Sequence, residues 1–169
     1  NRVLNLAGTT GGAIIDQSGT GNLKFSSALT ATGAGAKTLS LIGSTTGTGE
    51  LAGAVVNSTA NTSVFKDGTG TWTLSGANTY NGSTVVRRST LNLSGAAKTS
   101  TSGLYVVDNN AASTFNAKVN IASDVTASQA FIGDRAGSGQ VGAIYQTAGT
   151  VTFSQAAGVD NLRIGSVGG

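Results

Sequence analysis

Apolar residues recur at every second position in short runs along the whole chain, and the residues between them are mostly Asn, Lys, Ser or Thr. This alternation is typical of short β-strands that bury one face and expose the other. No stretch keeps apolar residues at helical spacing over three turns, so the pattern predicts no long helix. The residues we expect in the interior are Leu4, Leu6, Leu39, Leu41, Trp72, Leu74, Leu91, Leu93, Val119, Ile121, Val151 and Phe153.

Two kinds of block repeat along the chain. The first is an alternating strand that ends in glycine, and we align it as Leu4–Gly8, Leu39–Gly43, Trp72–Gly76 and Leu91–Gly95. The second, within residues 104–169, aligns Tyr105, Phe131 and Arg163 at spacings of 26 and 32 residues. Internal periods of about 20 to 50 residues are typical of solenoids, propellers and arrays.

These repeats favour a solenoid of stacked parallel strands over a β-sandwich. Variable repeat lengths with constant strand motifs suit coils whose loops tolerate insertions. A hairpin sandwich, which stays open as the alternative, would show more two-residue turns than Asp67-Gly68 and Asn81-Gly82. The chain has no Pro, as expected where interior strands donate to their neighbours. We expect one domain over residues 1–169, with three short strands per coil and about six or seven coils.

The composition excludes several classes of catalytic and metal-binding chemistry. The 169 residues include 26 Gly but no His and no Cys, so a serine triad, a thiol nucleophile and an ordinary zinc site are excluded. The net charge is only +3 and the basic residues are scattered, which does not fit nucleic-acid binding. No apolar run is long enough for a transmembrane helix. The chain starts without Met and stops within an apparent repeat, so we expect a longer parent protein.

Residues Lys66 to Leu93 carry a specific motif. From Gly68 to Thr84 they read Gly-Thr-Gly-Thr-Trp-Thr-Leu-Ser-Gly-Ala-Asn-Thr-Tyr-Asn-Gly-Ser-Thr. This segment resembles the autotransporter-associated β-strand repeat, also called the passenger-associated transport repeat. One departure is Ser89, where the family usually has Gly. The resemblance implies a right-handed parallel β-helix in a large secreted passenger or adhesin-like protein, and it implies no active site.

Each candidate functional site also has a purely structural interpretation. Gly137–Gly142 matches G-x-G-x-x-G, but Ala143–Thr147 after it is typical of a strand, so we expect an inter-strand turn and no cofactor. Asp108 and Asp134 occupy equivalent repeat positions, but the third equivalent is Ser166. We therefore predict no catalytic residue, no metal site and no cofactor-binding residue.

The remaining candidates are aromatic, basic and amide side chains. We expect Trp72 in the core, whereas Tyr80 could be buried or could stack on a sugar ring. Arg87 and Arg88 could contact anionic glycans, although a wet strand face or a turn is the simpler interpretation. Asparagines can form ladders or bond turn backbone, and the residues in question are Asn78, Asn109 and Asn110.

The sequence favours a structural, non-enzymatic rod on the outside of a bacterial cell, which displays or spaces other elements. The first alternative is a self-assembling subunit of an extracellular filament, surface layer or virion appendage. The second is a glycan-binding or glycan-cleaving β-helix. The expected partners are neighbouring coils of the same or identical chains, end-to-end copies and cell-surface glycans. We expect no nucleic-acid partner and no membrane insertion by this segment.

Overall fold

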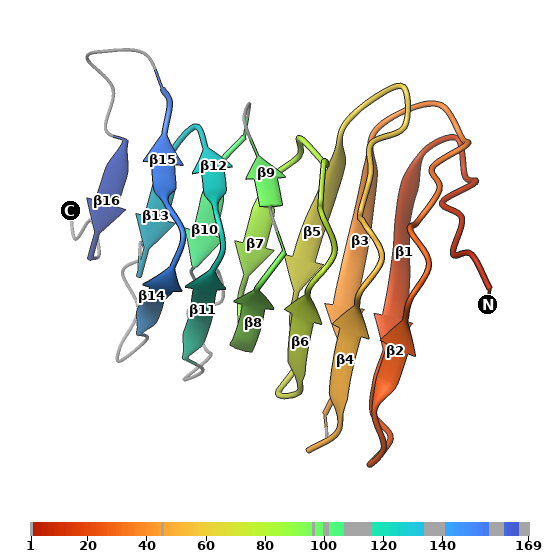
Figure 1. The fold of residues 1–169 in the computed structure, drawn as a ribbon, viewed down its shortest axis with the longest axis horizontal. Helices are drawn as coiled ribbons and strands as arrows, with labels where there is room; N and C mark the ends of the chain where they lie inside the picture. The colour runs from red at the N-terminus through yellow and green to blue at the C-terminus, as the bar shows by residue number, and fades with distance from the viewer. Residues whose placement is uncertain are drawn as a thin grey trace.

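The computed structural model describes residues 2–44, 46–95, 97–99, 102–106, 116–133, 141–155 and 161–165. These ranges contain sixteen strands and no helix. The strands form three sheets in which every neighbouring pair is parallel, and the coils stack side by side along the long axis of the molecule (Figure 1). The strands predicted from the alternation and the solenoid predicted from the internal repeats are confirmed, and the sandwich is excluded.

The largest sheet, sheet I, has seven strands. In spatial order they are β1 (Gly11–Asp16), β3 (Lys37–Ile42), β5 (Thr62–Lys66), β7 (Thr84–Val86), β10 (Leu104–Val106), β13 (Ala130–Ile132) and β16 (Leu162–Ile164). Sheet II has six strands: β2 (Leu23–Phe25), β4 (Thr48–Leu51), β6 (Thr71–Leu74), β8 (Ser89–Leu93), β11 (Ala117–Ala122) and β14 (Gly142–Ala148). Sheet III has three: β9 (Ala97–Thr99), β12 (Val125–Ala127) and β15 (Val151–Phe153).

The coils differ in length because the connections between strands differ. Trp72 pairs with Leu91, 19 residues further on, whereas Ala130 pairs with Leu162, 32 residues further on. The chain makes about five turns, fewer than the six or seven expected. The expectation divided the whole chain into coils of roughly 25 residues, whereas the strands of the sheets run only from Gly11 to Ile164.

The core is a set of continuous rows along the inside of the solenoid. Nine of the twelve residues predicted in the interior are buried, and Leu4, Val151 and Phe153 pack against them at the edge of the core. One row of sheet II stacks Leu51, Leu74, Leu93 and Ile121 on successive coils. Side chains of similar size stacked at the coil spacing exclude water along the rod, and this burial supplies the main stabilising term.

One predicted repeat alignment is partly wrong. Trp72 and Leu91 are equivalent, as predicted, because β6 pairs with β8. Leu39 is not equivalent to them: it lies in β3 of sheet I and pairs with Val64. The error has a physical cause, since every face of the coil uses the same alternation and the pattern does not distinguish one sheet from another. The second alignment is confirmed, because Tyr105 pairs with Phe131 and Phe131 with Arg163.

Among the described residues, three strands per coil occur only in the C-terminal half, where sheet III is present. In the N-terminal half the third side is extended chain with isolated contacts, such as the bridge between Asn5 and Thr30. Side chains replace part of the backbone ladder there: the Val55 amide donates to the Asn78 carboxamide rather than to a strand carbonyl, at 2.9 Å. The prediction of three strands in every coil is therefore wrong for the first coils.

Candidate functional site

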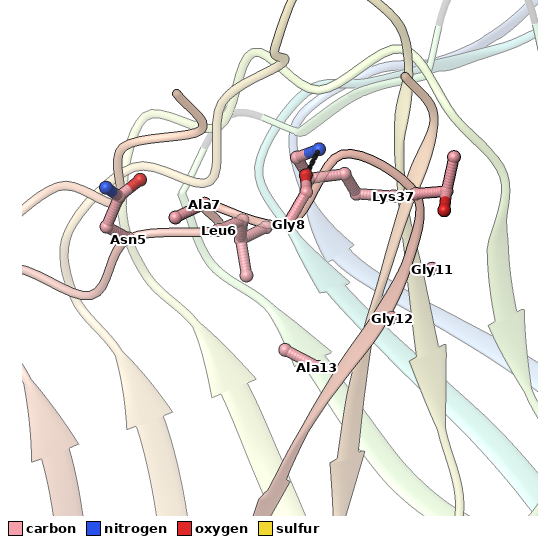
Figure 2. Close-up of a pocket in the computed structure, with 9 residues that line it drawn as sticks. Asn5, Leu6, Ala7, Gly8, Gly11, Gly12, Ala13 and Lys37 are labelled. Carbon is pink, nitrogen blue, oxygen red and sulfur yellow. Dashed lines mark hydrogen bonds between the residues drawn. The ribbon is translucent and has the colours of Figure 1, made fainter. Parts of the chain in front are cut away.

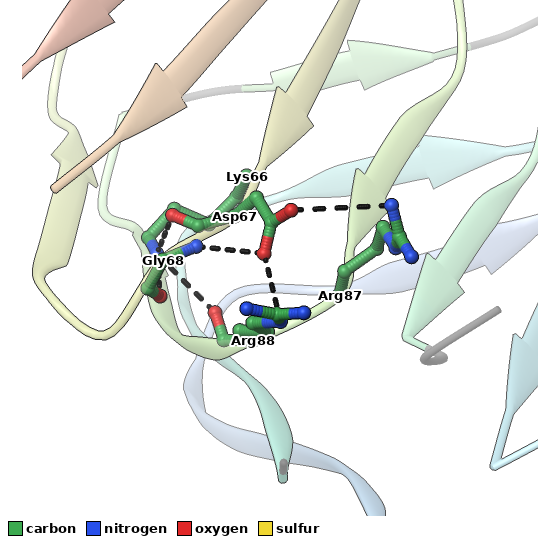
Figure 3. Close-up of polar contacts among 5 residues, drawn as sticks. All are labelled: Lys66, Asp67, Gly68, Arg87 and Arg88. Carbon is green, nitrogen blue, oxygen red and sulfur yellow. Dashed lines mark hydrogen bonds and ion pairs between the residues drawn. The ribbon is translucent and has the colours of Figure 1, made fainter. Parts of the chain in front are cut away.

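A cluster of polar side chains lies where β5 ends, and we call it the corner cluster (Lys66, Asp67, Gly68, Arg87 and Arg88; Figure 3). Lys66 is on an inner row, between Leu41 and Val86, and is fully buried. Its ammonium donates to three backbone carbonyls, those of Asp67 at 2.8 Å, Gly68 at 3.0 Å and Arg88 at 3.2 Å. Burial lowers the pKa of Lys66 to about 8, against the opposing effect of the Asp67 charge.

Asp67 connects the two coils from the outer side of the same corner. Its Oδ1 accepts the Gly68 amide at 2.7 Å and lies 3.2 Å from Nε of Arg88, while Oδ2 lies 3.9 Å from Arg87 (Figure 3). The Arg87 guanidinium also lies over the Phe65 ring, 5.7 Å from its centroid. The adjacent arginines lie in the turn between β7 and β8, in agreement with the simpler interpretation, and they form ion pairs across coils that this interpretation did not include. Sequence reasoning missed both Lys66 and Asp67 as their partners.

A groove of about 340 Å³ lies beside the corner cluster. Its lining includes Asp16 at the end of β1, Ser18 after that strand, Ser44 after β3, and Asp67 and Arg88. Ser18 donates to the Asp16 carboxylate, and the hydroxyls of Ser44 and Ser18 are 3.2 Å apart. In the described part of the chain, no group of three acidic, His or Cys residues could hold a metal ion. The groove can offer a carboxylate, hydroxyls and a guanidinium to a polar ligand.

The three distinctive side chains of the repeat motif all point inward. Trp72 is buried, as predicted, and its indole donates to the Ile42 carbonyl at 2.9 Å. Asn78 is buried and donates to the Gly76 carbonyl at 2.9 Å while accepting from Val55. Tyr80 is fully buried, with its hydroxyl 2.8 Å from that of Thr84, and burial raises its pKa to about 12. The Tyr80 ring is therefore not available to stack on a sugar ring.

Outward-facing side chains stack into ladders from coil to coil. On sheet I the Tyr105 and Phe131 rings stack with centroids 5.3 Å apart, and the Arg163 guanidinium lies 5.3 Å from the Phe131 centroid. On sheet II, Asn120 donates to Asn92 at 2.8 Å and Asn92 donates to Thr73 at 3.1 Å. These contacts join neighbouring coils, since stacked identical or similar side chains interact at the strand spacing.

An ion pair continues the ladder of sheet II towards the N-terminal end. Lys24 and Glu50 occupy paired positions on β2 and β4, and their charged atoms are 2.9 Å apart. The hydroxyl of Ser75 also donates to Glu50. The hydrogen bond from Ser75, followed by that from Lys24, holds the pKa of Glu50 below its ordinary value of 4.5. The Glu50 carboxylate therefore takes part in contacts that join neighbouring coils.

A second hollow, of about 310 Å³, lies in the first coil (Figure 2). Its lining runs from Asn5 to Ala13 and includes Lys37 of the next coil. The Lys37 ammonium donates to the Gly8, Ala34 and Gly35 carbonyls, much as Lys66 does at its own corner. Lys37 is nearly buried, so this hollow is the mouth of the solenoid interior rather than a pocket with free polar groups.

Several predicted positions lie outside the described residues. They are Asp108, Asn109, Asn110, Asp134 and residues 137–140 of the glycine-rich motif, together with Ser166. The spacing that aligned Asp108 with Asp134 is the spacing between Val106 and Ile132, and the structure confirms it there because these two residues pair. The strand predicted after the glycine-rich motif is also confirmed, as β14.

The fold and its contacts define the class of protein: a parallel β-solenoid whose coils are joined by buried rows and outward ladders. Residues 64–93 match the family model of the passenger-associated-transport-repeat, in agreement with the resemblance noted for residues 66–93. A repeat of autotransporter passengers is characteristic of secreted or surface-displayed proteins. No curated protein and no solved structure matches the chain. None of the described ranges holds a helix of the length and apolarity that crossing a bilayer requires.

Proposed function

We propose that this chain is a structural rod of a bacterial passenger or adhesin-like protein, which displays or spaces other elements outside the cell. The observation that carries the proposal is the use of the matched repeat: Trp72, Asn78 and Tyr80 are all buried and bonded within the solenoid. A motif whose distinctive side chains hold coils together builds a scaffold. The match at residues 64–93 supports secretion or surface display.

The stacking also explains how such a rod can be extended. Each coil contacts mainly its two neighbours, so a coil can be added without redesign of the rest. The seven strands of sheet I, at the usual strand spacing, correspond to a rod of roughly 30 Å. The ladders on both outer faces add contacts between coils that are independent of the core.

Duplication of one coil tests the rod function. Leu39 pairs with Val64, so residues 39–63 form one full coil, and a second copy inserted after residue 63 keeps the register. We expect the longer chain to fold with the same β-sheet circular dichroism and to lengthen by about 5 Å in small-angle X-ray scattering. A scrambled insert of the same composition is the control. Unfolding of the duplicated chain to the same extent as the control would contradict a modular rod.

The location outside the cell needs its own experiment. An epitope tag on the natural parent protein, detected with antibody on intact cells, should be accessible without permeabilisation. Protease added to intact cells should remove the tag. Label that appears only after permeabilisation would contradict surface display, and tag recovered only from the medium would indicate release.

We propose no catalytic role, and the groove beside the corner cluster is the place to test the glycan alternative. Its charged groups already have partners within the chain, since Ser18 donates to Asp16 and Asp67 pairs with Arg88. The stacked faces of Tyr105 and Phe131 support the same proposal, because sugar rings bind to open aromatic faces. A glycan array without hits and no turnover of uronic-acid polymers are expected. Binding that Asp16→Ala abolishes would favour the glycan alternative.

A further inference from the structure

The corner cluster holds a main-chain nitrogen against a side-chain carboxyl group. Asp67 is the one Asp in the sequence that is followed by Gly. In the folded chain the Gly68 amide donates to Oδ1 of Asp67 at 2.7 Å. The carboxyl carbon of Asp67 is one bond beyond that oxygen, so it is close to the nitrogen, and groups held together in this way react faster than free ones. Residue 68 has no side chain to shield the nitrogen, and a Cβ there would lie 2.3 Å from the Gly43 carbonyl oxygen.

A positive charge lies beside the peptide group that contains this nitrogen. The Lys66 ammonium donates to the Asp67 carbonyl oxygen at 2.8 Å (Figure 3). That oxygen shares the negative charge that develops when the Gly68 nitrogen loses its proton, so the ammonium stabilises the reactive form of the amide. At neutral pH the Lys66 amine is largely charged, because burial lowers its pKa only to about 8.

Arg88 acts on the carboxyl group itself. Its Nε lies 3.2 Å from Oδ1 of Asp67, in a position to stabilise the oxyanion that forms when a nitrogen adds to the carboxyl carbon. Asp67, Gly68 and Arg88 also line the groove of about 340 Å³, so water reaches the reacting groups. The ion pair favours the ionised carboxylate, which reacts less readily than the acid, and the reaction is therefore slow.

The fold protects the second pair of this kind. Asn81-Gly82 is the one Asn-Gly pair in the sequence, and in a flexible chain Asn-Gly rearranges more readily than Asp-Gly. In the folded chain, however, the Gly82 amide donates to the Thr62 carbonyl of the neighbouring coil at 2.9 Å. Gly82 is also buried. Its nitrogen is thus held away from the Asn81 side chain, and the fold reverses the intrinsic order of reactivity of the two pairs.

We propose that Asp67-Gly68 is a site of spontaneous covalent modification, at which the Gly68 nitrogen attacks the Asp67 carboxyl carbon and isoaspartate accumulates. The new N–C bond closes a five-membered succinimide ring. One C–O bond of the protonated carboxyl group breaks, and this hydroxyl leaves with the amide proton as one molecule of water. Water then adds to either carbonyl of the ring, which opens to Asp or to isoaspartate. Water is the only co-reactant.

Isoaspartate at residue 67 lengthens the main chain of the corner by one carbon. The carbonyls of residues 67 and 68 hold the Lys66 ammonium, so the three hydrogen bonds of that ammonium cannot all persist. The ion pair with Arg88 on the next coil is lost as well. The modification therefore loosens the contact between two coils and limits the lifetime of the rod. Only this last consequence rests on the proposed rod function, since the reaction itself needs the folded corner alone.

Peptide mass spectrometry combined with isoaspartyl methyltransferase labelling tests the proposal on the whole chain. The folded chain and the chain unfolded in urea are incubated side by side for weeks at neutral pH. We expect isoaspartate at residue 67 to form at least about threefold faster in the folded chain, while Asn81 stays unchanged there. In urea, Asn81 should react first. Isoaspartate at residue 67 that forms no faster in the folded chain than in urea would overturn the proposal, and it would leave the rod function untouched.

A variant of Lys66 tests the role of the ammonium. Lys66→Met removes the charge beside the Asp67 carbonyl, and Lys24→Met, on the outer row of sheet II, is the matched control. Circular dichroism establishes that each variant is folded. We expect isoaspartate formation to fall by about tenfold in Lys66→Met and to stay unchanged in Lys24→Met. An unchanged rate in folded Lys66→Met would overturn the assignment of the ammonium. If Lys66→Met does not fold, the comparison of the native chain with and without urea still decides the proposal.

Discussion

Gly49 and Trp72 occupy the same position on consecutive coils, and the indole of Trp72 fills the space that a side chain at residue 49 would need. A Cβ on Gly49 would lie 2.4 Å from the indole Cδ2 and Cε3 atoms. Trp72 is fully buried and its indole nitrogen is bonded to Ile42, so the ring has no room to move. The smallest residue, Gly49, thus lies directly beside the largest, Trp72, on the inner row, and their sizes complement each other.

Gly49→Ala should therefore destabilise the chain, by about 1–3 kcal/mol, because the added methyl group overpacks the core. Urea unfolding followed by tryptophan fluorescence measures the loss directly. Gly21→Ala is the control, since a Cβ at Gly21 meets no atom within 4 Å. Equal effects of the two substitutions would show that Trp72 does not pack on residue 49.

Asn78→Ala should cost about 1–3 kcal/mol, because it leaves the Val55 amide without its buried acceptor and removes the side-chain donor to the Gly76 carbonyl, which keeps only the backbone amide of residue 78. Asn92→Ala, on the half-buried outer ladder, should cost less than about 1 kcal/mol, since water can replace its bonds. Chemical denaturation of both variants checks the order. The reverse order would mean that the outer ladder, not the buried asparagine, holds the coils together.

Ser89→Gly should stabilise the chain. Ser89 is the one non-glycine residue with a positive φ among the described residues, at 54°. Relief of that conformation outweighs the extra freedom of glycine in the unfolded chain, so we expect a gain of about 0.5–1 kcal/mol in the free energy of unfolding. Thr90→Gly, one residue further along the same strand, should instead lose about 0.5–1 kcal/mol. Thermal melting of the two variants should give shifts of opposite sign.

The buried ammonium of Lys66 should make stability depend on pH. Its pKa is lowered from 10.5 to about 8, so between these values the unfolded chain binds more protons than the folded one. The free energy of unfolding should therefore rise as pH increases from about 8 to about 10.5, by on the order of 1–3 kcal/mol. Glu50, with a lowered pKa, titrates below this window. The pKa of Tyr80 rises from 10.0 to about 12, so this side chain lowers the free energy of unfolding as pH increases above about 10, in the native chain and in a Lys66 variant alike.

Two measurements check the Lys66 prediction. Urea unfolding at pH 7 and pH 10 should show the rise in the native chain and not in Lys66→Met. Nuclear magnetic resonance of the Lys66 side chain should report a midpoint near pH 8. A midpoint near 10.5 would show that the three carbonyls compensate fully for burial.

The alternation of apolar and polar residues was sufficient to predict strands and most of the core, and the internal repeats were sufficient to predict a solenoid. Short-range information is enough here because each strand reveals its buried face through a period of two. It was also enough to identify the segment around Trp72 and Tyr80 as a passenger-associated repeat, later matched at residues 64–93. The glycine usual at position 89 now has a physical reason, the positive φ of that residue.

The tertiary structure alone decided which strands are equivalent and which polar groups meet. Leu39 was aligned with Trp72, yet it stacks on Val64, because coil lengths vary and the alternation is the same on every face. Lys66 is buried and Asp67 pairs with Arg87 and Arg88 because the corner of one coil stacks on the next, about 20 residues away in sequence. Contacts between residues so far apart depend on the register of whole coils, which no local pattern in the sequence specifies.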